Sequence, residues 1–449
     1  MGRLFGTDGV RGVANTELTP ELAFNLGKAG AYVLSKEEQR PVVLIGKDTR
    51  ISGDMLEDAL SAGILSMGGN VIKVGVLPTP AVAYLVKYYK ATAGVVISAS
   101  HNSFEYNGIK FFNGEGFKLD DALEEQIEEL ILDKVDINSH ITGDKLGRCL
   151  TAEDDALELY VQFLQSTIDV SLEGMKLVLD CANGAAYQAA EAVFHRLGAE
   201  VTVLSNSPNG ININASCGST HPENLQTKVL ELQADLGLAF DGDADRLIAV
   251  DELGRIIDGD KTILLCARML KDCGLLAKDK VTATVMSNLG FHKAVSEMGC
   301  NVEVTQVGDR YVLESMLKTG GVIGGEQSGH IIFLNYTTTG DGILSALQLV
   351  KAVKASGKKP SELSDGITIY PQVLKNARIK NEYKKTYMED PEISAAITRV
   401  EAQMHGEGRV LIRPSGTEPL VRVMLEGQDI EVITELAQEL ALLITKRLG

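Results

Sequence analysis

The feature of this sequence that most limits its fold is a pattern that occurs three times along the chain. Each copy is a short apolar run with strand composition, then a helical stretch that ends in glycine, then a second apolar run. The first runs are Pro41–Gly46, Lys176–Asp180 and Val281–Met286, and the second runs are Val71–Val76, Val201–Leu204 and Val302–Val307. Strands joined through one helix are nearly always parallel, so each copy predicts a right-handed βαβ unit. A period above ~100 residues indicates duplicated domains rather than a solenoid.

The end of the chain has a different pattern. Arg409–Arg413 and Leu420–Glu426 have strand composition, and Asp429–Arg447 has apolar residues at helical spacing. At roughly 100–200 residues per domain, a chain of 449 residues is expected to form several domains. We therefore expect an α/β protein of four domains: three related α/β domains with mixed or parallel sheets, and a smaller C-terminal α+β domain. The expected boundaries are 1–152, 153–252, 253–368 and 369–449.

Charge and cysteine usage limit the class of protein. The formal net charge is −18, which disfavours nucleic acid and acidic membranes as partners, although a local cluster of arginine and lysine can still bind an anionic substrate. The six cysteines are scattered and form no C-x-x-C pair, which favours reduced thiols. The first residues lack the apolar run of a signal peptide, and no run reaches the ~18 apolar residues of a membrane span. We therefore expect a cytoplasmic protein without membrane insertion.

The sharpest chemical signal is a cluster of aspartates between two strand-like runs. Asp241, Asp243 and Asp245 alternate in a short loop between Leu236–Phe240 and Leu247–Val250. Carboxylates this close repel each other unless a cation neutralises them, and oxygen ligands favour a hard ion. The alternatives are a solvated acidic turn or a calcium site, but the flanking strands disfavour the first and the loop lacks the pattern of an EF-hand. The loop therefore predicts a Mg²⁺ site.

A second signal is a cluster of small polar residues after the apolar run Gly94–Ile97. It contains Ser100, a candidate nucleophile, with His101 beside it, and Lys110 follows a short turn downstream. Active sites of α/β folds lie at strand ends, although serine-rich loops are common and are usually only turns. The sequence is not a Gly-x-Ser-x-Gly elbow, so it gives little support to an esterase.

Three further loops are weaker signals. The loop after Arg413 carries two hydroxyls and a glycine and is followed by Arg422, so it is either a phosphate cradle or a simple hairpin turn. Two polar loops, Gly324–His330 and Phe5–Gly12, carry residues that can bind a sugar or an anion. Gly308–Arg310 lies at a strand end and is a candidate of second rank.

Taken together and in this order, the motifs FGTDGVRG, SASHN, NGIK, DGDADR, GEQSGH and RPSGTEP resemble the α-D-phosphohexomutase superfamily. The resemblance covers essentially the whole chain. It implies one motif per domain, across four domains around a central active-site cleft. Within the superfamily, the opening motif and Gln327 are similar to the branch that acts on glucosamine phosphates.

The resemblance also implies roles for individual residues. Ser100 would carry the transferred phosphoryl group, and the site would hold one Mg²⁺ between a Ser100 phosphate oxygen and Asp241, Asp243 and Asp245. Arg11, His101, Lys110 and His330 would line the reacting centre. The residues that bind substrate would be Arg246, Glu326, Ser328, Arg413, Ser415, Gly416, Thr417 and Arg422, of which the last five would hold the phosphate that is not transferred. The motif SASHN is usually followed by proline, and Ser103 stands there instead, which predicts a less rigid loop.

The implied reaction interconverts glucosamine 6-phosphate and glucosamine 1-phosphate, in the synthesis of UDP-N-acetylglucosamine and cell-wall precursors. A hexose 1,6-bisphosphate, of glucosamine or glucose, would be the intermediate and the activator. Two alternatives stay open: a mutase of glucose or mannose phosphates, and a non-catalytic phosphosugar-binding protein. The sequence is compatible with a homodimer and with a regulatory protein partner.

Overall fold

The computed structural model describes residues 4–6, 8–34, 40–133, 135, 137, 141–152, 154–384, 386–404, 406–415 and 418–449. The chain divides into two compact units. The first unit contains the chain up to Thr284 together with Asn301–Asp365, and the second contains Val285–Cys300 and Gly366–Gly449.

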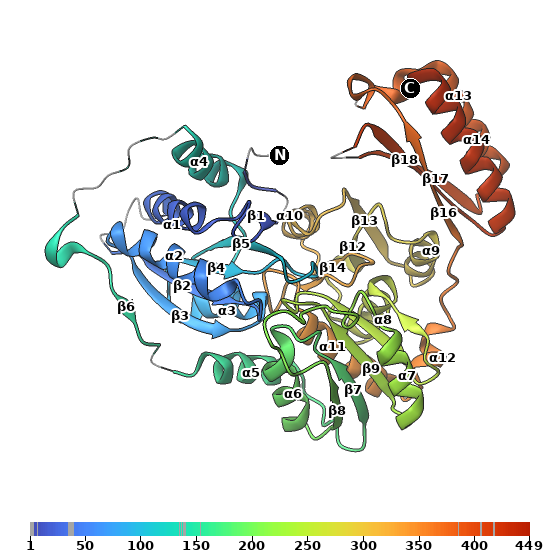
Figure 1. Cartoon of the computed structure of the whole chain (residues 1–449). Coiled ribbons are helices and arrows are strands. Elements are labelled where there is room, and N and C mark those ends of the chain that lie inside the picture. Colours follow the sequence, from blue (N-terminus) through green and yellow to red (C-terminus); the bar gives the residue numbers. More distant parts are fainter. Residues whose placement is uncertain are drawn as a thin grey trace. The chain divides into compact units, whose positions relative to one another are not determined.

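Three sheets of the first unit share one topology, which confirms the predicted repeat (Figure 1). In each sheet the first strand of the repeat pairs in parallel with the second strand on one side and with a third strand on the other. A fourth strand then returns antiparallel to the third. The repeat therefore includes a hairpin between its third and fourth strands, which the periodicity alone did not show.

The first sheet has the strand order β1-β5-β4-β2-β3-β6. Its strands are β1 (Val10–Val13), β2 (Val42–Lys47), β3 (Asn70–Val76), β4 (Ala93–Ile97), β5 (Tyr106–Asn113) and β6 (Cys149–Leu150). Its helices are α1 (Pro20–Leu34), α2 (Gly53–Ser66), α3 (Thr79–Tyr88) and α4 (Asp121–Leu132). Apolar residues of α1, α2 and α4 form one core cluster with Val43, Val95 and Ile97, whereas α3 packs through Val82 and Val86 on the opposite face. The sheet is thus covered on both faces, which explains the continuous burial of β4.

The second sheet has the order β11-β10-β9-β7-β8, and the third has the order β13-β12-β14-β15. The elements of the second are β7 (Lys176–Asp180), β8 (Glu200–Leu204), β9 (Leu236–Phe240), β10 (Leu247–Asp251), β11 (Ile256–Ile257), α5 (Ala156–Ser166), α6 (Ala186–Arg196) and α7 (Glu223–Leu232). Those of the third are β12 (Lys280–Thr284), β13 (Asn301–Thr305), β14 (Ile323–Gly325), β15 (Ile331–Phe333), α8 (Gly259–Asp272), α10 (Asp309–Thr319), α11 (Gly342–Ser356) and α12 (Pro360–Ser364). Short 3₁₀ turns lie at Gly143–Lys145, Ala277–Asp279, Asn381–Tyr383 and Tyr387–Glu389.

Glycines end the repeat helices as the sequence predicted. Gly68, Gly198 and Gly299 follow α2, α6 and the third repeat helix, α9 (Leu289–Glu297), and their φ angles are 83°, 93° and 67°. Glycine adopts this left-handed conformation without the steric penalty of a side chain, so each helix stops there and the next strand begins within three residues.

The second unit contains a three-stranded antiparallel sheet, in the order β16-β18-β17, and two long helices. Its elements are β16 (Gln372–Arg378), β17 (Gly408–Pro414), β18 (Leu420–Gly427), α13 (Pro391–Gln403) and α14 (Ile430–Leu448). By its contacts the helix α9 also groups with this unit, although in the chain it joins β12 to β13 and so remains the helix of the third repeat. Glu426 explains the difference, because this buried carboxylate accepts the backbone N–H of Leu289, at 2.9 Å, at the start of α9.

Among the described residues, no helix combines the length and the apolar character that crossing a membrane requires.

Candidate active site

The three polar loops predicted from the sequence occupy the same position in their three sheets. Ser100 lies in the connection between β4 and β5, and the aspartate loop connects β9 to β10. Glu326 and His330 lie in the connection between β14 and β15. The three sheets share one topology and all lie in the first unit. Each of the three loops is therefore the connection between the third and fourth strands of its repeat.

Ser100 lies against the aspartate loop. It is 1% exposed, and its hydroxyl donates a hydrogen bond of 2.6 Å to Oδ2 of Asp241. Nδ1 of His101 is 3.4 Å from the same hydroxyl. Burial and the nearby charges of Arg246 and Arg11 lower the pKa of His101 to about 4, so its imidazole is neutral at neutral pH.

The aspartate loop has the donor set of a metal site. Carboxylate oxygens of Asp241, Asp243 and Asp245 lie within 4.8 Å of one another, and all three residues are buried. Burial and the charges of its two neighbours raise the pKa of Asp241 well above its usual value, and burial with Asp243 raises the pKa of Asp245. Oδ1 of Asp243 and Oδ1 of Asp245 have no hydrogen-bond partner in the described part of the chain. Buried, unpartnered oxygens that repel each other fit a divalent cation, so these residues can hold a metal ion.

Lys110 connects the aspartate loop to the N-terminal loop. Its side chain is 2% exposed, and its ammonium lies 2.8 Å from Asp243 Oδ2 and 2.9 Å from Asp8 Oδ2. Burial alone would lower the pKa of Lys110, but the charges of Asp243 and Asp8 raise it, so the side chain is a cation. Asp8 also pairs with Arg11, which places this predicted residue in the same network.

The network continues to the third sheet through a second buried lysine. Lys118 bridges Asp8, at 2.6 Å, and Asp309, the first residue of α10. His330 is 2% exposed, and its Nε2 lies 3.5 Å from Asp309 and 3.8 Å from Asp245. Neither ring nitrogen of His330 has a hydrogen-bond partner among the described residues.

Arg246 joins the aspartate loop to the third loop. Its backbone N–H donates to Asp241 Oδ1 at 3.2 Å, and a β-bridge pairs Arg246 with His330. Glu326 accepts the N–H of Gly308 at 3.1 Å and is partly exposed. Ser328 is exposed at the tip of the same turn. The structure therefore brings the predicted residues of the first unit, apart from the exposed Ser328, into one connected set.

The remaining predicted residues lie on the hairpin of β17 and β18 in the second unit. Arg413 and Arg422 are directly opposite each other across this antiparallel pair. Burial and the charge of Arg422 lower the pKa of Arg413. Like charges that face each other destabilise a sheet, and a bound anion between these two guanidinium groups would relieve their repulsion. Ser415 is buried beside them, whereas Gly416 and Thr417 lie outside the described residues.

Sequence reasoning missed several residues of the network. Thr79, at the start of α3, donates its hydroxyl to Asp243 at 2.7 Å. Lys118 follows β5, and the sequence gives no local sign that it pairs with Asp309. Asp8 lies in the motif FGTDGVRG, and Asp309 lies in the weaker candidate segment Gly308–Arg310, but neither was predicted as a site residue. These residues can be recognised as part of the site only from contacts between segments that are distant in the sequence.

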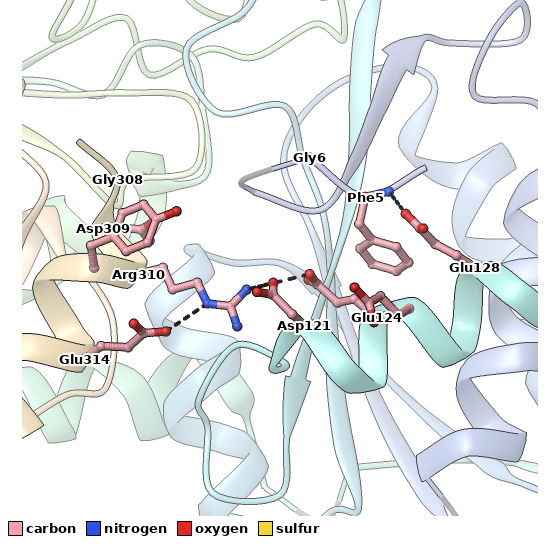
Figure 2. A pocket seen from close by; sticks show the side chains of 11 residues that line it. Phe5, Gly6, Asp121, Glu124, Glu128, Gly308, Asp309, Arg310 and Glu314 are labelled. Carbon is pink, nitrogen blue, oxygen red and sulfur yellow. Dashed lines mark hydrogen bonds and ion pairs between the residues drawn. The ribbon is translucent and has the colours of Figure 1, made fainter. Parts of the chain in front are cut away.

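A cavity of about 220 Å³ lies beside the network, between α4 and α10 (Figure 2). Arg310 spans it and pairs with Asp121 and with Glu314, the latter at 3.1 Å. The other charged lining residues are acidic: Glu124, Glu125, Glu128 and Asp309. This acidic lining does not suit an anionic ligand, although Asp309 belongs both to the lining and to the network.

Known proteins match the chain along almost all of its length. Profiles of the phosphoglucomutase/phosphomannomutase family match alpha/beta/alpha domains I, II and III at residues 2–136, 158–254 and 258–370, and the C-terminal domain at 374–443. The phosphoglucosamine mutase of Alkaliphilus oremlandii is 57% identical over 450 residues, which cover 100% of both chains. The chain belongs to the phosphoglucosamine mutase family.

Solved structures of phosphohexomutases have the same fold as this member of the family. A phosphoglucomutase/phosphomannomutase family protein from Burkholderia thailandensis is 25% identical, with a TM-score of 0.79 over 99% of this chain and 98% of that one. The N-acetylphosphoglucosamine mutase of Aspergillus fumigatus, solved in complex with GlcNAc-6P and magnesium, is 17% identical. Its TM-score is 0.73, over 100% of this chain and 96% of that one.

Proposed function

We propose that this protein interconverts glucosamine 6-phosphate and glucosamine 1-phosphate, and that Ser100 carries the transferred phosphoryl group. The observation that carries the proposal is the 2.6 Å hydrogen bond between the Ser100 hydroxyl and a buried carboxylate of the aspartate loop. The family of the chain supports the same reaction. The product would feed the synthesis of UDP-N-acetylglucosamine and of cell-wall precursors.

The transfer has two halves. In the first half, the P–O bond to Ser100 Oγ breaks, and the free hydroxyl of the sugar forms a new P–O bond, which gives a 1,6-bisphosphate. The proton of that hydroxyl would pass to the departing serine oxygen through the neutral imidazole of His101, whose Nδ1 is 3.4 Å from Ser100 Oγ. In the second half, the P–O bond between the other phosphate and its sugar oxygen breaks, Ser100 Oγ forms a new bond to that phosphorus, and the proton of the serine hydroxyl passes to the sugar oxygen. A hexose 1,6-bisphosphate, of glucosamine or of glucose, would also phosphorylate the resting enzyme.

Charge neutralisation in this reaction falls to residues around Ser100. Asp241, Asp243 and Asp245, with a phosphate oxygen on Ser100, would hold one Mg²⁺. The bound ion would neutralise charge on the oxygens of the transferred group. The Lys110 ammonium, which is held in place by Asp243 and by the N-terminal loop, would add a second cation.

The substrate would be held by residues outside this centre. Arg11 and His330 would line the reacting group, and Arg246, Glu326 and Ser328 would contact the sugar. On the second unit, the hairpin residues Arg413, Ser415, Gly416, Thr417 and Arg422 would bind the phosphate that is not transferred. Paired guanidinium groups match the geometry of a phosphate and form charge-assisted hydrogen bonds with it.

A substrate panel with a serine variant tests the proposal. Wild-type protein should convert glucosamine 1-phosphate faster than glucose or mannose 1-phosphate, and intact mass should show one phosphoryl group on Ser100. Ser100→Ala should abolish turnover and phosphorylation, whereas Ser103→Ala, on the same loop, should retain both. Preference for glucose or mannose phosphates would favour the alternative mutases. Binding without turnover in the wild type would favour a non-catalytic phosphosugar-binding protein.

Two further proposals concern organisation. We place the domain boundaries at 1–152, 153–252, 253–368 and 369–449, because each range contains the main strands of one sheet. We also propose a cytoplasmic location, which agrees with the free, buried thiols of Cys181, Cys217 and Cys266.

A further inference from the structure

Ser100 has a backbone conformation that serine rarely adopts. Its φ angle is 53°, in the left-handed region. Residues other than glycine, asparagine and aspartate hold this conformation only where the surroundings enforce it. Ser103 stands in this loop where the resembled family usually has a proline after the motif SASHN. Other contacts must therefore keep Ser100 in place.

Arg50 supplies most of these contacts. Its side chain is fully buried, and its guanidinium donates hydrogen bonds to four backbone carbonyl oxygens of the loop. These belong to Ser100 at 2.9 Å, Asn102 at 2.8 Å, Tyr106 at 3.0 Å, and Ser103. The remaining N–H, on Nε, donates to Asp48 at 2.9 Å. Every N–H group of the guanidinium thus has an acceptor, and its charge has a buried counter-ion.

Asp48 acts on the backbone N–H of Ser100 through the side chain of Ser98. It accepts the hydroxyl of Ser98 at 2.6 Å, and the oxygen of that hydroxyl accepts the backbone N–H of Ser100 at 3.0 Å. The Asp48–Arg50 pair therefore holds both the N–H and the carbonyl of Ser100. It does so without touching the Ser100 hydroxyl.

Asn214, in the second domain, also donates hydrogen bonds to the backbone of the Ser100 loop. Its Nδ2 donates to the carbonyl oxygens of Ser100, at 2.9 Å, and Asn102, at 3.0 Å. Asn214 is 9% exposed and itself has a φ of 57°. The carbonyl of Ser100 thus receives one donor from its own domain and one from the domain that carries the aspartate loop.

We infer that Arg50 and Asn214 are positioning residues that hold Ser100 in its left-handed conformation and so aim its phosphorylated side chain at the aspartate loop. This inference rests on the proposed function of Ser100. Phosphoryl transfer depends mostly on positioning, and a misplacement of ~1 Å can cost about 100-fold in rate. Neither residue needs to touch the sugar, so the affinity for substrate should not depend on them.

Asn214→Asp is the sharpest test. The change keeps the shape of the side chain and tolerates the left-handed backbone, because asparagine and aspartate both adopt it. It replaces the N–H donors by an oxygen that faces two carbonyl oxygens. Asn212→Asp is the matched control, since it adds the same charge two residues away, where the amide donates to Ser207 at 3.1 Å.

Three quantities should be measured for each variant: the melting temperature, kcat and KM for glucosamine 1-phosphate, and the rate of Ser100 phosphorylation by glucose 1,6-bisphosphate, followed by intact mass. For Asn214→Asp we expect kcat and the phosphorylation rate to fall about 10- to 100-fold, with KM within about twofold of wild type. Asn212→Asp should match the wild type. Arg50→Lys keeps the positive charge beside Asp48 but loses the planar guanidinium that donates to the four carbonyl oxygens. Folded Arg50→Lys protein should therefore show the same loss in kcat.

Two results would overturn the inference. One is an Asn214→Asp protein with the kcat and phosphorylation rate of Asn212→Asp. The other is a loss confined to melting temperature or to KM, which would make the contacts merely structural or place Asn214 in the substrate site. Failure of the proposed function gives a different result, because the wild type itself would then not be phosphorylated on Ser100.

Discussion

The contact between the aspartate loop and the Ser100 loop makes Gly242→Ala an informative perturbation. A methyl group on Gly242 would lie 2.5 Å from the carbonyl oxygen of Ser100 and 2.9 Å from Nδ2 of Asn214. The φ angle of Gly242 is not in the left-handed region, so alanine can adopt its backbone conformation and the effect is purely steric. Ordinary van der Waals contact begins at 3.4 Å, so the two loops must move apart by about 0.9 Å.

That displacement sets the expected magnitude. A shift of ~1 Å in a positioned reacting group costs about 100-fold in rate, which corresponds to roughly 3 kcal/mol of activation free energy. We therefore expect kcat of Gly242→Ala to fall about 100-fold, and its apparent affinity for Mg²⁺ to fall as well, because Asp241 and Asp243 flank the methyl group. Overpacking should destabilise the protein by about 1–3 kcal/mol.

The assay is kcat for glucosamine 1-phosphate at saturating Mg²⁺, with a Mg²⁺ titration and a melting curve. Gly321→Ala is the control, because its methyl group would approach nothing closer than 3.4 Å and its φ is also outside the left-handed region. A folded Gly242→Ala protein with kcat within about threefold of Gly321→Ala would refute the steric coupling of the two loops.

Three further outcomes are expected. Asp243→Asn should weaken Mg²⁺ binding measured by calorimetry on metal-free protein; unchanged affinity would contradict the metal assignment. Arg422→Ala should lower kcat/KM about 10- to 100-fold, at about 1.5–3 kcal/mol per charge-assisted contact. It should leave the melting temperature unchanged or higher, because it removes the like charge that faces Arg413. A lower melting temperature with unchanged kinetics would mean that the pair is structural. Burial raises the pKa of Asp341 to about 7, so the folded state binds more protons than the unfolded state and loses stability as pH rises from about 4 to about 7. Asp341→Asn should therefore flatten the fall of melting temperature over that window, and an unchanged slope would contradict the shift.

The local patterns of the sequence determined the repeat and the glycines at which its helices end. Strand composition, helical spacing and glycine stops predicted the parallel pairs β2–β3, β7–β8 and β12–β13, and the structure confirms all three. The aspartate loop was equally readable, because three carboxylates held close together between two buried strands repel one another unless a cation binds them. These features depend on neighbours in the chain, so periodicity and composition are sufficient to reveal them.

Tertiary structure alone decided which side chains meet. The Lys118 ammonium bridges Asp8 and Asp309, which are 110 and 191 residues away in sequence. Arg50 supports the Ser100 loop from about 50 residues upstream, which is how the chain retains a constrained loop with Ser103 in the place of proline. Such pairs leave no periodic signal, because each is created by the packing of segments that are far apart in the sequence rather than by local conformation. The sequence by itself therefore determined the elements and the chemistry of each loop, and the folded chain determined their alignment.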